Sequence, residues 1–230
     1  MKFQYFQGVY VDDFEDISEN GLAELTIKYA NSETDKQVEL LDGKKIDLQA
    51  NDPIIYKKDT PLCLLGTMGM MFSSVNENTK KIMVEAAAFN QEILRKSYKN
   101  HNIRTDSYQR HEKAVDPEQT TMAIHLFVET LLQSCPDLKV CGDIQDAYPN
   151  PYIIEPISLS LNKLNTYLSL NLTLKQAKEI LEKLGFQVEL ENENILATPP
   201  SFRATGDISI QEDLIEEIGR IYGYYNIQSV

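Results

Sequence analysis

The sequence predicts an α+β protein with two domains: a mixed α/β domain whose first half is β-rich and whose helices come after it, then a small α/β domain. Three observations predict this. Short strand-like segments separated by turn signals fill residues 22–89, two helical segments follow in residues 90–135, and a helix, a hairpin and another helix occur after residue 156. At 230 residues with 42% hydrophobic residues, the chain is long enough for one or two cores.

The strands come first. Residues 22–30 are strand-like, and Asp42 and Gly43 separate two short strands as a hairpin turn, because that pair tolerates a positive φ. Residues 53–65 contain a second pair of strands around a Lys-Lys-Asp-Thr turn. The segment IMVEAAAF, residues 82–89, is a short apolar strand that carries one carboxylate, Glu85.

Two helices are expected next. Asn90 is a good N-cap for a helix over residues 90–100. Asp116 and Pro117 are typical of the cap and the first position of a helix over residues 116–135. The apolar positions of this second helix predict a broad buried face: Met122, Ile124, Leu126, Phe127, Leu131 and Leu132.

A domain boundary is expected in the segment 136–156, which is rich in Pro, Asp and Gly. We place it so that the domains are residues 1–148 and 149–230. In the second domain, Thr173 and Gln176 form a capping box at the start of a helix that stops at Gly185. A hairpin follows, Pro199 and Pro200 end it, and a last helix closes the domain.

Composition excludes several classes of protein. The net charge of −13, with 35 acidic and 22 basic residues, argues against a free-standing nucleic-acid binder, which needs cationic surface. No apolar run approaches the roughly 20 residues needed to span a bilayer, and the first residues do not resemble a signal peptide. The three cysteines are an odd number without the spacing of metal ligands, which suits a reducing cytosol.

The last helix carries a group of carboxylates. Ser209 and Glu212 are spaced as a capping box, so the helix is expected to begin at residue 210 or 211. Its buried stripe is expected to comprise Leu214, Ile215, Ile218 and Tyr222. Asp213, Glu216 and Glu217 lie at i, i+3 and i+4 on one surface. Two interpretations stay open at this point: a solvated acidic face with a Glu216–Arg220 pair, or a Mg²⁺ site that Asp207 could join.

Two blocks of the sequence resemble one family. PPSFRATGDISIQEDLIEEIGRIYGYYNI, residues 199–227, resembles the end of the small winged-helix-like domain of the bacterial phenylalanyl-tRNA synthetase beta chain. LLGTMGM, IMVEAAAFNQEIL and NIRTDSYQRHEKAVDPEQT resemble, in order, the editing domain of the same chain. The resemblance therefore implies an editing-type domain, incomplete at its start, over residues 1–148 and a winged-helix-like domain over residues 149–230.

The family binds a Mg²⁺ ion that is shared with its catalytic alpha chain. The matching acidic positions are Asp207, Asp213, Glu216 and Glu217. The resemblance also implies a cytoplasmic phenylalanine–tRNA ligase in which alpha and beta chains form a heterotetramer and no membrane takes part. ATP is used by the assembly and is not bound by this chain alone, and phenylalanine tRNA is reached through the assembly. The role implied for the chain is architectural and metal-sharing.

In this family, editing removes tyrosine that was joined to phenylalanine tRNA by mistake. The positions that match the editing pocket are Gly66, Gly69, Glu85, Thr105 and Ser107. Glu85 would bind the tyrosine hydroxyl, and the two glycines would let the substrate approach the backbone. Gly8 stands where the family has a histidine, and Met70 replaces a glycine and could fill the pocket. We therefore expect a degenerate pocket, with no catalytic residue assigned.

Two alternatives remain beside a ligase beta chain. One is a free-standing deacylase that acts in trans on mischarged tRNA. The other is a nucleic-acid-binding module that uses Lys175, Lys178 and Lys183, although Glu179 and Glu182 lie on the same helix. Whether the chain is an excised piece or a natural truncation stays open, as does its oligomeric state.

Overall fold

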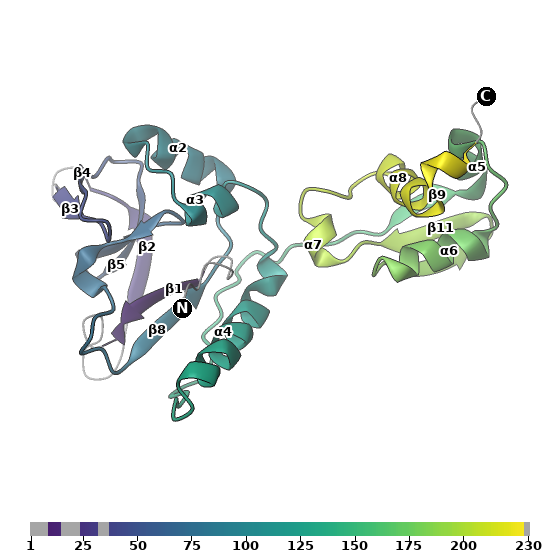
Figure 1. Ribbon diagram of the computed structural model, residues 1–230. Helices are drawn as coiled ribbons and strands as arrows, with labels where there is room; N and C mark the ends of the chain where they lie inside the picture. The colour runs from purple at the N-terminus through teal and green to yellow at the C-terminus, as the bar shows by residue number, and fades with distance from the viewer. Residues whose placement is uncertain (1–8, 15–23, 32–36, 228–230) are drawn as a thin grey trace. The chain divides into compact units, whose positions relative to one another are not determined.

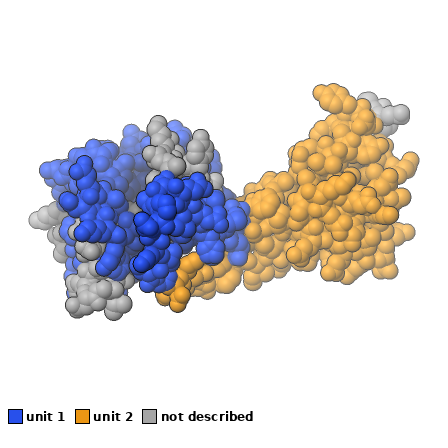
Figure 2. Space-filling view, turned by 60° about the horizontal axis from the view of Figure 1, so that its bottom comes forward, with its two compact units in different colours: residues 1–142 blue, residues 143–230 orange. Residues whose placement is uncertain are grey.

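The structure is a computed structural model that describes residues 9–14, 24–31 and 37–227, with side chains from residue 14 onward. It comprises two compact units, residues 1–142 and residues 143–230, which Figure 2 shows in different colours. The predicted boundary between residues 148 and 149 lies close to this division, and its position stays a prediction. Each unit combines sheets and helices, so the expected α+β class is confirmed.

Unit 1 is built on antiparallel strands (Figure 1). Its four-stranded sheet has the order β2 (Leu25–Tyr29), β5 (Pro53–Lys57), β6 (Thr60–Leu64), β7 (Met68–Gly69). Two pairs accompany it: β3 (Gln37–Glu39) with β4 (Lys45–Asp47), and β1 (Val9–Asp13) with β8 (Ile82–Ala86). A short 3-10 turn, η1 (Met71–Ser73), follows β7.

The hairpins form where turn chemistry predicts them. Gly43 has φ +81° between β3 and β4, a conformation that a glycine adopts without steric cost. Lys58 has φ +54° in the turn between β5 and β6. Both predicted hairpins are confirmed.

The helices of unit 1 follow the strands. They are α2 (Gln91–His101), α3 (Asp106–His111), the 3-10 turn η2 (Pro117–Gln119) and α4 (Thr120–Ser134). The predicted cap of α2 is confirmed, because Asn90 accepts hydrogen bonds from the backbone N–H groups of Glu92 and Ile93. α3 was not predicted, and it begins where the Thr105 hydroxyl accepts from the backbone N–H of Tyr108.

The prediction of a broad buried face on α4 is wrong. Among its six apolar positions Phe127 is buried, whereas Met122 and Leu126 are 60% and 50% exposed. Within the described part of unit 1, α4 runs along β8 and touches little else in its own unit (Figure 1). A single neighbouring strand covers only a narrow stripe of a helix, so Met122, Leu126 and Leu132 stay exposed, and Ile124 and Leu131 are only partly covered.

A buried carboxylate joins α2 to the strands. Asp52, just before β5, is fully buried. Its Oδ1 accepts from Ser97 Oγ at 3.1 Å and from Asn100 Nδ2 at 3.0 Å, and its Oδ2 accepts from Gln49 N at 2.7 Å. His101 Nε2 lies 2.5 Å from the same Oδ2. A buried charge needs this many partners, and here they fix the C-terminal half of α2.

Unit 2 has one three-stranded antiparallel sheet of order β10–β11–β9. Its elements in chain order are β9 (Ile157–Ser160), α5 (Leu161–Leu168), α6 (Leu174–Lys183), β10 (Gln187–Glu191), β11 (Asn194–Thr198), α7 (Ser201–Ala204), α8 (Gln211–Tyr222) and η3 (Tyr224–Asn226). The Thr173–Gln176 capping box at the start of α6 is confirmed. Helices α5, α6 and α8 pack on the sheet around fully buried leucines such as Leu164 and Leu214.

Across the described ranges, from residue 9 to residue 227 with their two gaps, the helices are too short or too polar to traverse a bilayer.

Candidate functional site

Three of the five predicted editing-pocket residues meet at one turn of unit 1. Gly66, in the turn between β6 and β7, has φ +65°. The Ser107 hydroxyl, from the first turn of α3, donates to the Gly66 carbonyl oxygen at 3.1 Å. The Thr105 hydroxyl donates to the carbonyl oxygen of Thr67 at 2.7 Å. Both hydroxyl protons are therefore used to fasten α3 onto the turn.

The chain's own side chains cover the two glycines. A Cβ atom added at Gly66 would lie 2.9 Å from both terminal methyl groups of Leu94 and 3.1 Å from the Phe89 ring. A Cβ at Gly69 would lie 3.1 Å from the Leu41 side chain. The glycines thus permit close packing of the protein against the turn.

The contact at Gly66 can be measured against a matched glycine. We expect Gly66→Ala to destabilise unit 1 by about 2–4 kcal/mol, because a left-handed alanine costs about 1–2 kcal/mol and crowding of the buried Leu94 adds a similar amount. Gly43→Ala is the control: it also has a positive φ, but nothing lies within 4 Å of its added Cβ. Urea denaturation should show a smaller loss for Gly43→Ala, and equal losses would contradict the packing role.

The other two predicted editing residues, Gly69 and Glu85, lie within strands and not at the Gly66 turn. Gly69 belongs to β7 and pairs with Cys63 of β6. Glu85 is half-buried in β8, which belongs to a separate sheet, and it makes polar interactions of its own. The residue that prompted the expectation of a degenerate pocket, Gly8, lies outside the described residues. Met70 is 2% exposed within the core that contains Leu40 and Ile54, so its side chain is a core side chain.

Sequence reasoning missed a buried histidine near this turn. His111, at the end of α3, is fully buried, and in the part of the chain that the structure describes neither ring nitrogen has a hydrogen-bond partner. Its ring centre lies 4.8 Å from that of Phe89. Burial lowers the pKa of His111 to about 4, so the imidazole is neutral at pH 7. Its position on a short helix after a capping threonine gave no sign of this burial.

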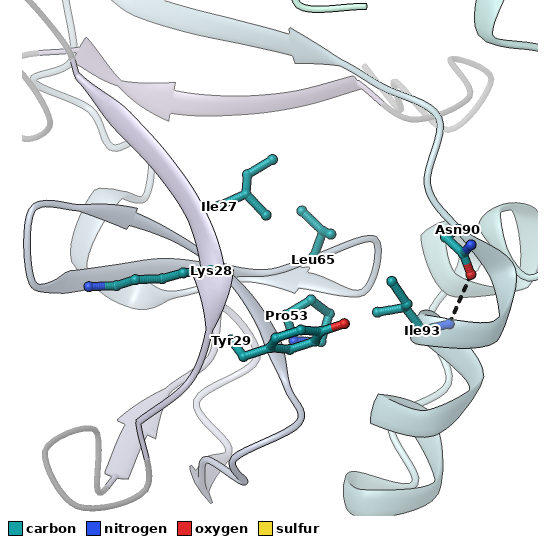
Figure 3. A pocket seen from close by; sticks show the side chains of 7 residues that line it. All are labelled: Ile27, Lys28, Tyr29, Pro53, Leu65, Asn90 and Ile93. Atoms are coloured by element: carbon teal, nitrogen blue, oxygen red, sulfur yellow. Dashed lines mark hydrogen bonds between the residues drawn. The ribbon is translucent and has the colours of Figure 1, made fainter. Parts of the chain in front are cut away.

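A pocket of about 360 Å³ lies between β2 and the start of α2 (Figure 3). It is lined by Ile27, Lys28, Tyr29, Pro53, Leu65, Asn90 and Ile93. In Figure 3 the Tyr29 ring lies against Pro53, with its hydroxyl toward Ile93 of α2. The lining is mostly apolar, and none of the five predicted editing residues belongs to it.

In unit 2, α8 begins at Gln211 as predicted, but its cap differs. The Asp213 Oδ2 atom accepts from the backbone N–H groups of Ser209 at 2.7 Å and Ile210 at 2.9 Å. The predicted Ser209–Glu212 capping box is therefore wrong. Glu212 instead pairs with Lys163 of α5 at 2.6 Å, because it points away from the helix start toward that neighbour.

The stripe of α8 that faces the core is mostly as predicted. Leu214, Ile215 and Ile218 are buried as predicted, whereas Tyr222 is 37% exposed, so its predicted place in the buried stripe is wrong. Glu217 is buried on the same helix, which was not expected of a carboxylate. Glu216, one position earlier, is exposed.

Two arginines surround Glu217. Arg203 of α7 donates from Nη2 to Glu217 Oε1 at 3.0 Å and from Nη1 to Oε2 at 3.3 Å, and its Nε donates to Asp207. Arg220 Nη2 donates to Glu217 Oε2 at 2.5 Å, whereas Glu216 was the expected partner of Arg220. The hydrogen bonds from Arg203 hold the pKa of Glu217 below its usual value, and Glu217 in turn raises the pKa of Arg203. Arg203 was missed, although its spacing of four from Asp207 was a readable signal.

These contacts do not fit a ready-made magnesium site. Among the residues that the structure describes, no group of three or more His, Cys, Asp or Glu side chains is arranged to hold a metal ion. Both oxygens of Glu217 are bonded to guanidinium groups, and Asp213 is bonded to backbone N–H groups. Mg²⁺ prefers an octahedral set of free oxygen ligands and waters. Magnesium binding by Asp207, Asp213, Glu216 and Glu217 therefore stays a prediction for an assembly with a partner chain.

Comparison with known proteins assigns both units. The family described as "B3/4 domain" matches residues 5–136, and the family described as "tRNA synthetase B5 domain" matches residues 157–224. A phenylalanine–tRNA ligase beta subunit from Carboxydothermus hydrogenoformans is 33% identical over 208 residues, covering 89% of this chain and 25% of that protein. The same subunit from Neisseria meningitidis is 36% identical over 190 residues, covering 83% and 24%.

A solved structure is also similar. The crystal structure of an N-terminal fragment of the phenylalanyl-tRNA synthetase beta subunit from Pyrococcus horikoshii has 16% identity and a TM-score of 0.49, covering 95% of this chain and 61% of that one. The chain spans about a quarter of the length of the curated relatives it matches. From the match over residues 5–136 the chain belongs to the B3/4 domain family, and the relatives that align with most of its length are beta subunits of phenylalanine–tRNA ligase.

Proposed function

We propose that the chain is the B3/4 and B5 portion of a phenylalanine–tRNA ligase beta subunit and that its role in protein synthesis is architectural. The observation that carries this proposal is the order of the two domain matches along a single chain. A B3/4 domain followed by a B5 domain occupies most of the 230 residues, and the aligned relatives continue through both. No phosphate-binding loop or nucleophile–base pair occurs in the sequence, so we assign ligation to an alpha partner.

The geometry of unit 1 supports an inactive editing pocket. The hydroxyl protons of Thr105 and Ser107 are donated to backbone carbonyls. Leu94 and Phe89 occupy the space above Gly66. A tyrosyl group that approached this turn would have to displace packed side chains, and Thr105 and Ser107 could offer it only acceptor oxygens.

The partners and cofactors belong to the assembled enzyme. We propose an alpha chain as the direct partner, in a heterotetramer, with phenylalanine tRNA bound by the assembly and ATP used there. Mg²⁺ shared with the alpha chain enters at the acidic side of α8 only if the alpha chain supplies further ligands. We place the assembly in the cytoplasm, where tRNA is charged.

A nucleic-acid-binding role for α6 has little support. Lys175 pairs with Glu179 at 3.9 Å and Lys178 with Glu182 at 3.6 Å. Lys178 also donates to the carbonyl oxygen of Val188. Carboxylates on the same helix repel a phosphate backbone and so oppose the attraction of these two lysines.

The proposal is tested by activity measurements on the purified chain. We expect no phenylalanine-dependent ATP–pyrophosphate exchange from the chain alone, and hydrolysis of tyrosyl-tRNA no faster than in buffer. We also expect the chain to form a complex of defined mass with the alpha subunit encoded by the same genome, measured by sedimentation. Deacylation that disappears in Glu85→Ala would instead establish the trans-acting deacylase, and failure to bind the alpha subunit would contradict the architectural role.

A further inference from the structure

Arg203 connects two elements of unit 2 through carboxylates. It lies on α7, bonds both oxygens of Glu217 on α8, and bonds Asp207 in the segment between these helices. The Arg203 side chain is 22% exposed and the Glu217 side chain 7% exposed. A two-pronged guanidinium–carboxylate pair with so little contact with water is a strong and directional interaction.

The charges in this group are balanced within the chain. Arg220 adds a second guanidinium to Glu217. Two arginines therefore face two carboxylates, and the group carries no net charge. A metal ion beside Glu217 would lose the attraction of that carboxylate and would meet two positive groups at close range.

We propose that Arg203 is an internal counter-cation: it closes α7 onto α8 in the absence of metal and keeps divalent ions from Glu217 until its guanidinium is displaced. The contact between α7 and α8 that Arg203 makes belongs to the fold of unit 2, so this proposal does not depend on a role in a ligase. The consequence for any assembly is that a partner which brings Mg²⁺ to this helix must first move Arg203.

Binding of Mn²⁺ to the full chain tests the proposal, because Mn²⁺ takes the same oxygen ligands as Mg²⁺ and can be followed by water-proton relaxation. We expect wild-type protein to show no Mn²⁺ site that depends on Glu217. Arg203→Gln should gain a Glu217-dependent site that binds Mn²⁺ at least about tenfold more tightly than the general binding of wild type, since its removal frees Asp207 and the Oε1 atom of Glu217 while Arg220 keeps Oε2. The gain should vanish in the double variant Arg203→Gln/Glu217→Gln, which separates this site from general binding to an acidic chain.

Arg220→Gln is the matched control. Arg220 makes one bond to Glu217 and its side chain is 47% exposed, so its removal should produce a much smaller gain in Mn²⁺ binding. A wild-type Mn²⁺ site that Glu217→Gln abolishes would overturn the proposal. So would a folded Arg203→Gln variant that gains no site.

Folding of the variants is read independently by hydrogen exchange of peptides from α8. Arg203→Gln leaves a buried carboxylate with one partner fewer and should lower protection there. Replacing Glu217 as well removes a buried charge that Arg220 alone compensates, so the double variant should recover part of that protection. If the double variant is no better protected than Arg203→Gln, the pair is not what closes α7 onto α8, and the proposal fails even where the single variant does not fold.

Discussion

Asp52→Ala is expected to destabilise unit 1 by about 3–5 kcal/mol, enough to unfold a marginal domain. The substitution removes the acceptor of Ser97, Asn100 and the Gln49 backbone and the partner of His101. Donors left without an acceptor in a dry interior cost about 1–3 kcal/mol each, although water can recover part of this. The C-terminal half of α2 should lose its attachment to the strands.

The measurement is hydrogen exchange of α2 peptides together with urea denaturation followed by circular dichroism. The control is Asp59→Ala. The Asp59 side chain is fully exposed and pairs with Lys28, so the substitution should leave the stability of unit 1 unchanged. Asp52→Asn keeps the shape and one acceptor oxygen, so it should fall between wild type and Asp52→Ala. Equal stability of the Asp52→Ala and Asp59→Ala variants would show that the buried group is dispensable.

His111→Leu is expected to abolish an acid sensitivity of unit 1. Burial lowers the pKa of His111 to about 4 in the folded protein, from an ordinary value of 6.5. Between these two pH values the unfolded chain binds more protons than the folded one. The free energy of unfolding therefore has its full value with respect to His111 above pH 6.5 and falls as the pH drops toward 4. The full effect is about 3 kcal/mol.

Urea denaturation of wild type and His111→Leu from pH 7.5 to pH 4.5 measures this difference. The variant should be at least as stable at pH 7.5. Leucine has a similar volume, and it removes two buried ring nitrogens that have no hydrogen-bond partner among the described residues. His125→Leu, at an exposed position of α4, is the control, and its unfolding free energy should depend on pH as that of wild type does. Parallel curves for wild type and His111→Leu would mean that His111 finds a partner in solution.

Several interactions between residues close in sequence could be predicted, although the Ser209–Glu212 box and the partner of Arg220 were not, and those between distant residues could not. The Asn90 cap, the Thr173–Gln176 box and the Gly43 turn are each decided within a few residues. The bonds Ser97–Asp52 and Thr105–Thr67 join residues 45 and 38 apart. Local patterns carry no information about such pairs, because the fold that creates them depends on the whole chain.

For the candidate sites too, the sequence indicated which residues take part but not the contacts that they make. The resemblance identified Gly66, Thr105 and Ser107, which the structure does bring together. It could not indicate that their hydroxyl protons are already donated. On α8, Asp213, Glu216 and Glu217 were visible in the sequence, but their separation into a cap, an exposed side chain and a buried ion pair depends on where Arg203 and the helix start lie. The apolar surface of α4 was misjudged because periodicity shows which residues share a face and not what covers it.

Gly43 and Gly66, the left-handed glycines in the described part of unit 1, differ in the evolutionary freedom that they allow. Gly43 faces open space, so asparagine or aspartate, which tolerate a positive φ, would be acceptable replacements over generations of drift. Gly66 is closed in by Leu94 and Phe89, so a larger residue there requires a compensating smaller one nearby. Among descendants of this gene, position 43 should therefore vary by itself, whereas position 66 should change only together with position 94 or 89.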